Sequence, residues 1–257
     1  MTQVTTTGLG VSQLPQELIV RSSVPSDKKY NEYKPWLRHD FIYSCAYCTM
    51  SEAEAQAIRF TIDHYEPIKA RPDLLGEYDN LMYCCDECNR RKGDRSPPAD
   101  ARANGWRFFR PDQDYWGQHF KRKGYRLESV SNTGEFSIDA LDLNRLALRR
   151  LREIRERLTR CEDHIAEGIL ALRRFSIDRL PPHVKGAAVR YIGQAITMRG
   201  EIVDSIDRLL RQYARSPLLD VESGSELEAR TQERQARMQK AEALFPGNWR
   251  APRREHN

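Results

Sequence analysis

The sequence lacks the features of a membrane or secreted protein. No apolar run approaches the length needed to cross a bilayer, and the first residues are polar instead of basic and then apolar. We therefore expect a soluble, cytoplasmic protein with no membrane partner. A glycine-rich phosphate loop of the Walker type is also absent, so ATP hydrolysis would have to come from a partner. The 257 residues, 39% of them hydrophobic, can still bury a core and form one or two domains, of which we favour two.

Cysteine is scarce, and its spacing argues for a metal site. Four of the six cysteines form two Cys-x-x-Cys pairs: Cys45, Cys48, Cys85 and Cys88. Without a secretory signal such pairs favour reduced thiolates over disulfides, and four thiolates suit tetrahedral Zn²⁺. We predict a structural zinc site. Cys84 could replace Cys85 as a ligand, but only Cys85 keeps the two-residue spacing to Cys88, so we expect Cys84 in a buried strand and Cys161 in a helical core.

A second group of polar residues accompanies the cysteines. Asp63 and His64 lie between the two pairs, and Asn89 directly follows Cys88, the second cysteine of the second pair. A carboxylate and an amide oxygen suit a hard cation such as Mg²⁺. A neighbouring imidazole is then free to accept a proton. This half of the pattern indicates catalysis.

Positive charge is concentrated in the middle of the chain. The formal net charge is +5, but residues 90–160 alone contain 18 Lys and Arg against 10 Asp and Glu, a balance of +8. Such a stretch suits capture of a polyanionic substrate. For the part from Arg149 to Arg160, a solvated helix face explains the charge equally well.

Hydrophobic periodicity predicts an α+β protein. Residues 1–30 should be a tail or irregular wrap, followed by a short helix over 30–41 that packs beside the first cysteine pair. The expected order over the cysteine-rich part is strand, loop, strand, helix: a strand over 60–63, a strand over 81–84, and a helix capped by Asp86 that carries Cys88, Asn89 and Lys92.

The second half of the chain should be mostly helical. A β-hairpin is predicted first, with residues 125–130 and 135–138 alternating around Ser131–Gly134. Apolar residues then recur at helical spacing over 147–172 and over 184–213, on either side of Pro181-Pro182, which predicts a helical hairpin. A more polar helix should cover 226–245. The predicted regions are a tail (1–30), a domain that contains both cysteine pairs and ends in a hairpin extension (31–140) and a helical region (141–250).

The polar residues named above resemble the motif of the HNH endonucleases. Asn80 stands sixteen residues after His64, and Asn89 nine residues later. The two cysteine pairs flank these residues as in the zinc-bearing subgroup of the family, and Cys85–Asp94 reads CDECNRRKGD, which is close to its usual wording. The resemblance covers residues 41–94 and implies a ββα-metal fold. A looser similarity extends through Leu141–Arg145, and Asn89 stands where many members have a second histidine.

The resemblance implies a role for each residue of the motif. His64 would be the general base, Asp63 and Asn89 would hold one catalytic divalent cation, Mg²⁺ or Mn²⁺, and Asn80 would keep His64 oriented. Lys92, one turn after Asn89, would contact phosphate or steady the transition state. Arg90 and Arg91 would contact the nucleic-acid backbone together with Lys92.

Two functions from different classes are compatible with these residues. The first is a metal-dependent endonuclease that hydrolyses DNA phosphodiester bonds, which by family analogy could be the effector of a prokaryotic anti-phage defence or restriction system. It would then meet a partner ATPase or sensor protein through its helical region, and cutting both strands would need a homodimer or two sequential nicks. The second is a zinc-organised nucleic-acid-binding or adaptor module without cleavage activity.

Overall fold

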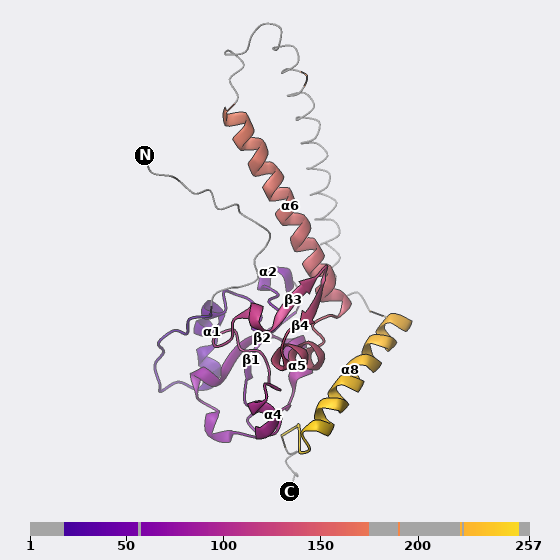
Figure 1. The fold of residues 1–257 in the computed structure, drawn as a ribbon. Helices are drawn as coiled ribbons and strands as arrows, with labels where there is room; N and C mark the ends of the chain where they lie inside the picture. Colours follow the sequence, from indigo (N-terminus) through magenta and orange to yellow (C-terminus); the bar gives the residue numbers. More distant parts are fainter. Residues whose placement is uncertain (1–17, 56–57, 175–189, 191–221, 223, 252–257) are drawn as a thin grey trace, which may run out of the picture. The chain divides into compact units, whose positions relative to one another are not determined.

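The computed structural model describes residues 18–55, 58–174, 190, 222 and 224–251 (Figure 1). The backbone divides into two compact units. One comprises residues 14–149 and 220–257, and the other residues 1–13 and 150–219. Over the described residues, no helix combines the length and the apolar character that crossing a membrane requires.

A two-stranded sheet and one helix form the centre of the first unit. Strands β1 (Phe60–His64) and β2 (Leu81–Cys85) pair antiparallel, with Phe60 opposite Cys85 and His64 opposite Leu81. Helix α3 (Asp86–Lys92) follows β2 without a loop and contacts both strands. Every residue of β2 is buried, as expected for a strand that is covered on both faces. The predicted α+β fold class and the order strand, loop, strand, helix are confirmed.

Helix α3 is only seven residues long, and its charged residues stabilise it at both ends. Asp86 and Glu87 lie in its first turn and Arg90–Lys92 in its last, which complements the helix dipole at both ends. Gly93 ends the helix with a φ of 52°, a left-handed value that glycine adopts readily. Cys85 is the capping residue and Asp86 the first residue of the helix, so the prediction that Asp86 caps it was wrong by one position.

Short helices precede and surround this core. The predicted helix beside the first cysteine pair is confirmed as a 3-10 turn followed by α1, and its residues Tyr33, Leu37 and Phe41 are buried. The short elements of the first unit are η1 (Tyr30–Tyr33), α1 (Lys34–Asp40), α2 (Glu52–Ala55), η2 (Pro72–Leu74), η3 (Tyr78–Asn80), α4 (Ala99–Ala103) and η4 (Trp116–Gln118).

The hairpin after the core is placed differently from the prediction. Strands β3 (Phe120–Lys123) and β4 (Arg126–Ser129) pair around Gly124, which has a φ of 57°. Residues 135–138 belong to helix α5 (Asn132–Leu141) instead of a second strand. The Ser131 hydroxyl accepts a hydrogen bond from the Gly134 backbone N–H and so caps α5. This local cap outweighs the apolar alternation that suggested a strand.

Two long helices are described in the second half of the chain. Helix α6 (Leu146–Arg174) confirms the predicted helix over 147–172, and α8 (Ser225–Leu244) confirms the polar helix near the end. The second apolar stripe over 184–213 and Pro181-Pro182 lie outside the described residues, as does the side chain of Cys161. Helix α8 packs against α5 within the first unit (Figure 1). A separate helical region over 141–250 stays a prediction.

Candidate functional site

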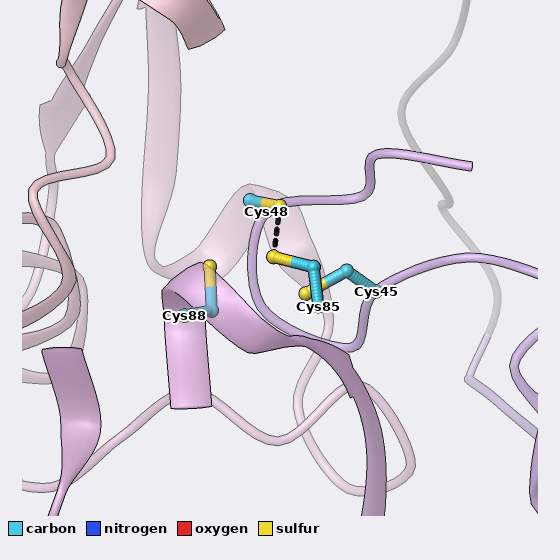
Figure 2. Close-up of side chains that lie close together, drawn as sticks. All are labelled: Cys45, Cys48, Cys85 and Cys88. Atoms are coloured by element: carbon cyan, nitrogen blue, oxygen red, sulfur yellow. Dashed lines mark hydrogen bonds between the residues drawn. The ribbon is translucent and has the colours of Figure 1, made fainter. Parts of the chain in front are cut away.

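The four cysteines of the two pairs meet in one buried cluster. Cys45 and Cys48 lie in the loop after α1, Cys85 ends β2, and Cys88 lies in the first turn of α3 (Figure 2). Their sulfur atoms all lie within 4.8 Å of one another, and the sulfurs of Cys48 and Cys85 are 3.8 Å apart. Tetrahedral zinc with Zn–S bonds of about 2.3 Å separates its sulfurs by about 3.8 Å. The cluster therefore fits zinc.

Cys84 is not part of the cluster. Its sulfur lies 3.9 Å from the Thr61 hydroxyl, and the residue is fully buried in β2. Neighbouring residues of a strand point to opposite faces, so Cys84 and Cys85 cannot both face the other sulfurs. The prediction of Cys84 as a buried strand residue is confirmed.

The cysteine cluster has a positively charged neighbour that the sequence did not single out. Arg145 is 7% exposed, and its Nη2 atom lies 3.8 Å from the Cys88 sulfur. Burial, followed by the neighbouring thiols, raises the pKa of Cys45 well above its ordinary value. Four buried thiolates thus require compensating positive charge. A divalent cation would supply half of it and Arg145 part of the remainder.

The Asp63 carboxylate is held on both of its oxygens by buried donors. The Tyr47 hydroxyl donates to Oδ2 over 2.6 Å, and the Lys92 ammonium lies 3.0 Å from Oδ1. Lys92 also donates to the backbone carbonyl of His64 over 2.7 Å, and its ammonium lies 5.7 Å from the centre of the Phe108 ring. The first cysteine pair and α3 therefore both position this carboxylate.

Lys92 is placed differently from the expectation. Its side chain is 0% exposed, and a fully buried ammonium that is paired with a carboxylate and a carbonyl does not reach a phosphate in this conformation. Asn89 and Lys92 do both project toward β1, as their spacing on the helix predicts. In the structure Lys92 holds Asp63 in place.

Asn89 lies on the same side of β1 as Asp63. Its amide nitrogen donates to the Thr61 hydroxyl over 3.0 Å, and Thr61 and Asp63 share one face of the strand because they are two residues apart. An amide that donates through its nitrogen keeps its oxygen for a metal. The Asp63 carboxylate and the Asn89 amide thus supply oxygen ligands of the kind that Mg²⁺ or Mn²⁺ takes.

The His64 ring lies next to the loop between the two strands. One of its nitrogens, Nε2, is 2.9 Å from the Leu75 backbone carbonyl, and the Tyr30 ring packs edge-on at 5.0 Å between centroids. A carbonyl only accepts hydrogen bonds, so Nε2 carries the proton and Nδ1 keeps a lone pair. This tautomer is the one that can take up a proton at Nδ1. Tyr30 was not predicted as a neighbour of the site.

Asn80 ties the loop between the strands together. Its side-chain oxygen accepts from the Glu66 backbone N–H over 2.8 Å, and its nitrogen donates to the carbonyls of Glu66 and Leu74, each over 3.2 Å. Leu74 precedes the residue whose carbonyl holds His64. Asn80 is only 5% exposed, so it acts on the backbone of the loop.

The two arginines of α3 differ in their surroundings. The Arg90 side chain is 74% exposed and pairs with Glu87. Arg91 is 30% exposed, lies 2.7 Å from Glu87 and also reaches Asp142 at 3.4 Å. Contacts of both residues with nucleic acid stay a prediction. Arg90 is the more exposed of the two and is therefore more accessible to a nucleic acid.

Comparison with known proteins agrees with this geometry. Residues 45–95 match the HNH endonuclease family, so the chain carries an HNH endonuclease domain that covers both cysteine pairs and the polar residues between them. No solved structure is significantly similar to the chain.

Two curated proteins are similar to parts of the chain. The Septu protein PtuA of Bacillus mycoides (strain KBAB4) is 30% identical over 135 residues, which cover 43% of this chain and 19% of that protein. The Septu protein PtuB of Bacillus thuringiensis is 26% identical over 102 residues, 40% of this chain and 37% of that protein. The chain thus matches well under half the length of either relative.

Proposed function

We propose that the protein is a metal-dependent endonuclease that hydrolyses DNA phosphodiester bonds. The observation that carries this proposal is the assembly of Asp63, His64, Asn80 and Asn89 around β1, β2 and α3, inside the segment that matches the HNH endonucleases. Asp63 and Asn89 offer oxygen ligands. His64 offers a basic nitrogen, and Asn80 fixes the loop between the strands. An adaptor module would need none of these arrangements.

Each residue has a separate task in the proposed reaction. His64 takes a proton from the attacking water at Nδ1, because its Nε2 atom is occupied by the Leu75 carbonyl. Asn80 keeps that carbonyl in place through the loop backbone. Asp63 and Asn89 would hold the divalent cation, Mg²⁺ or Mn²⁺, which would neutralise charge on the phosphate when bound. Lys92 and Tyr47 fix the Asp63 carboxylate.

The zinc site has a structural role in this proposal. Cys45 and Cys48 anchor the loop that carries Tyr47, while Cys85 and Cys88 anchor the junction of β2 and α3. One zinc ion would thus link the loop and the helix that together hold Asp63. Structural zinc contributes folding free energy directly, which a core of two short strands and one short helix needs.

We further propose that the nuclease belongs to a prokaryotic anti-phage defence system. The likeness to two Septu proteins, PtuA and PtuB, supports this. An effector of this kind would act with a partner ATPase or sensor protein. Copurification of the full chain with a partner protein from its native host would support such a role, and constitutive cleavage of the genome in uninfected host cells, without any trigger, would contradict it.

Cleavage of supercoiled plasmid tests the nuclease directly. We expect the purified protein to nick the plasmid with Mg²⁺ or Mn²⁺ and not with EDTA, and His64→Ala to lose this activity at least 100-fold, the scale of general-base catalysis. His39→Ala is the matched control, because His39 lies on the surface with its side chain 78% exposed. Nicking at the normal rate by His64→Ala would contradict the assigned mechanism.

One observation favours the zinc-organised binding module as the alternative. Asp63 and His64 are 6% and 8% exposed and already have internal partners. If the protein is such a binding module, the full chain would bind nucleic acid in a salt-sensitive manner and would give no cleavage product with Mg²⁺ or Mn²⁺.

A further inference from the structure

A cavity of about 450 Å³ lies beside α8, and of its lining residues only Arg95 falls within the segment that matches the HNH endonucleases. It is bounded on one side by the segment after α3 and by the end of the described chain, which pair as an antiparallel bridge with Arg95 opposite Arg250. The Ala251 backbone N–H donates to the Asp94 carbonyl over 2.7 Å, and that of Ser96 donates to the Trp249 carbonyl over 3.0 Å. These bonds fix both arginines at the cavity.

Positive charge in this cavity exceeds the negative charge that faces it. Arg95, Arg234 and Arg250 line it, and the acids among its lining residues are Asp139 and Glu242. Asp139 is already held by Arg237 through two contacts of 2.7 Å. Arg234 lies 3.1 Å from Asp142, a carboxylate that Arg91 also reaches at 3.4 Å. The exposed Glu242 is the remaining acid in the lining, against the two arginines Arg95 and Arg250.

The surroundings of Arg95 show the same imbalance. Burial, and then the charges of Arg250 and Arg234, lower the pKa of Arg95 to about 10, and Glu242 offsets only part of this effect. Its Nη1 atom donates to the carbonyls of Arg91 and Lys92 at the end of α3. The guanidinium is thus fixed in orientation, and a fixed guanidinium offers its other N–H groups to an anion with little loss of side-chain entropy.

Neutral donors from α8 complete the lining of the cavity. Gln235 and Gln239 are four residues apart on the helix and so project from one face into the cavity. Two guanidinium groups and two side-chain amides are the donor set that proteins use to bind phosphate. The cavity is larger than one phosphate group, which leaves space for the adjoining sugar.

We propose that this cavity binds a backbone phosphate of the nucleic-acid strand on which the HNH centre acts. The inference rests on the proposed nuclease function. A strand is favoured over a free nucleotide because Arg95 follows Lys92 by three residues and caps the same helix that carries Asn89. The phosphate site and the nuclease centre thus share one rigid element, with Arg95 at the C-terminal end of α3 and Asn89 about one turn before that end.

Salt-dependent binding tests the proposal on the full chain. His64→Ala serves as the background so that DNA stays intact, and anisotropy of a labelled duplex is measured from 50 to 300 mM salt, values on the order of those that resolve counterion release. Adding Arg250→Gln should weaken binding and reduce the slope of log K against log salt by about 1, as expected for one lost phosphate contact. Arg95→Gln should act in the same direction.

Two further variants keep the result interpretable. Arg250 is exposed, so its variant should fold even if Arg95→Gln, which also removes the cap of α3, does not. Lys123→Gln removes the same charge from the β3–β4 hairpin, where the side chain is 78% exposed, and should leave the slope unchanged. An Arg250→Gln slope equal to that of its background would overturn the proposal.

A free anion is the competing occupant, and a separate measurement distinguishes it. Inorganic pyrophosphate is titrated at constant ionic strength into the protein with intact His64 and into its Arg250→Gln variant. Pyrophosphate binding that depends on Arg250, together with an unchanged DNA slope, would also overturn the proposal. Plasmid nicking by the protein with intact His64 is scored independently, so a failed nuclease assignment and a failed phosphate site give different results.

Discussion

Lys92 places a positive charge beside the Asp63 carboxylate before any metal binds. Both side chains are buried, at 0% and 6% exposure. Removing one partner of a buried ion pair leaves the other charge uncompensated. Lys92 is therefore best understood as a residue that holds the Asp63 carboxylate in place on the face of β1 that Asn89 also contacts.

Replacing Lys92 with methionine tests this role. We expect Lys92→Met to lower the free energy of unfolding by about 3–5 kcal/mol, the usual cost of breaking a buried pair, and Mn²⁺ to raise the melting temperature of the variant more than that of the unmodified protein. Thermal unfolding with and without Mn²⁺ measures both effects. Lys123→Met is the exposed control. Unchanged stability of Lys92→Met would show that the ammonium does not hold Asp63.

Gly134 allows the first turn of α5 to approach the end of η4. A β-carbon at this position would lie 1.9 Å from the backbone oxygen of His119, and a backbone atom cannot move aside as a side chain can. We expect Gly134→Ala to lower the free energy of unfolding by roughly 1–3 kcal/mol or more. At Gly117 nothing lies within 4 Å of an added β-carbon, so Gly117→Ala should be close to neutral. Chemical denaturation compares the two, and equal stabilities would refute the close approach.

The sequence identified residues whose chemistry depends on short spacing and missed those that arrive from far along the chain. The spacing of Cys45 and Cys48, repeated at Cys85 and Cys88, sufficed to predict the cysteine cluster. Arg145 contacts Cys88 across 57 positions of sequence, and nothing local marks it. Tyr47 stood inside a recognised pair but gave no signal, because its contact with Asp63 exists only in the folded chain.

At the scale of elements, the ββα core was predictable and the hairpin was not. Strands β1 and β2 are rich in β-branched, aromatic and apolar residues between proline and glycine punctuation, and the charges at both ends of α3 favour a helix. After the core, apolar alternation over 125–138 suggested two strands. The predicted second strand is instead the helix α5, which the Ser131 side chain caps. This one hydrogen bond favours the helix over the strand that the apolar alternation suggested.

Glu222 joins the start of α6 to α8. It accepts a hydrogen bond from the Leu146 backbone N–H over 3.0 Å, and Arg230 and Arg149 lie against it. Burial by itself would raise the pKa of Glu222, but these contacts, led by that with Arg230, lower it to about 2 from an ordinary 4.5. Its folded pKa therefore lies below its unfolded pKa.

This shift predicts an acid-sensitive contact. A lowered folded pKa contributes stability that is present above about pH 4.5 and is lost as the pH falls toward 2. We expect the unmodified protein to be more stable than Glu222→Gln at pH 6 and the two melting temperatures to converge at acidic pH. Glu226→Gln, in which the residue is more exposed at 61%, should show a smaller difference. A constant gap between the protein and Glu222→Gln at all pH values would contradict the shift.

At the scale of the whole molecule, the unit with the cysteine cluster is interrupted in sequence. It consists of residues 14–149 and 220–257, and α8 returns to it through Arg237 and Asp139. A continuous nuclease domain followed by a helical region is the simplest assumption from sequence. Which helices return to the core depends on long-range contacts such as this one, which apolar periodicity does not encode.

The interrupted unit predicts that residues 150–219 can be removed. Arg149 and Glu222 lie 3.1 Å apart at their side chains, so a short glycine-serine linker can close the gap. We expect the shortened protein to keep a full complement of zinc and its metal-dependent nicking, and to lose any partner that binds residues 150–219. Metal analysis and plasmid cleavage measure this. Loss of zinc after the excision would mean that the unit needs these residues to fold.

The pairing of Arg149 with Glu222 also bears on how such a chain can diverge. A segment that leaves and re-enters through neighbouring residues can be lengthened, shortened or replaced without displacing the chain on either side of it. Related chains can then differ within residues 150–219 while residues 14–149 and 220–257 keep their arrangement. Residues 150–219 are therefore the part of the chain that can be replaced most easily. Any replacement would have to keep the contacts of Glu222 with Arg149 and with the Leu146 backbone.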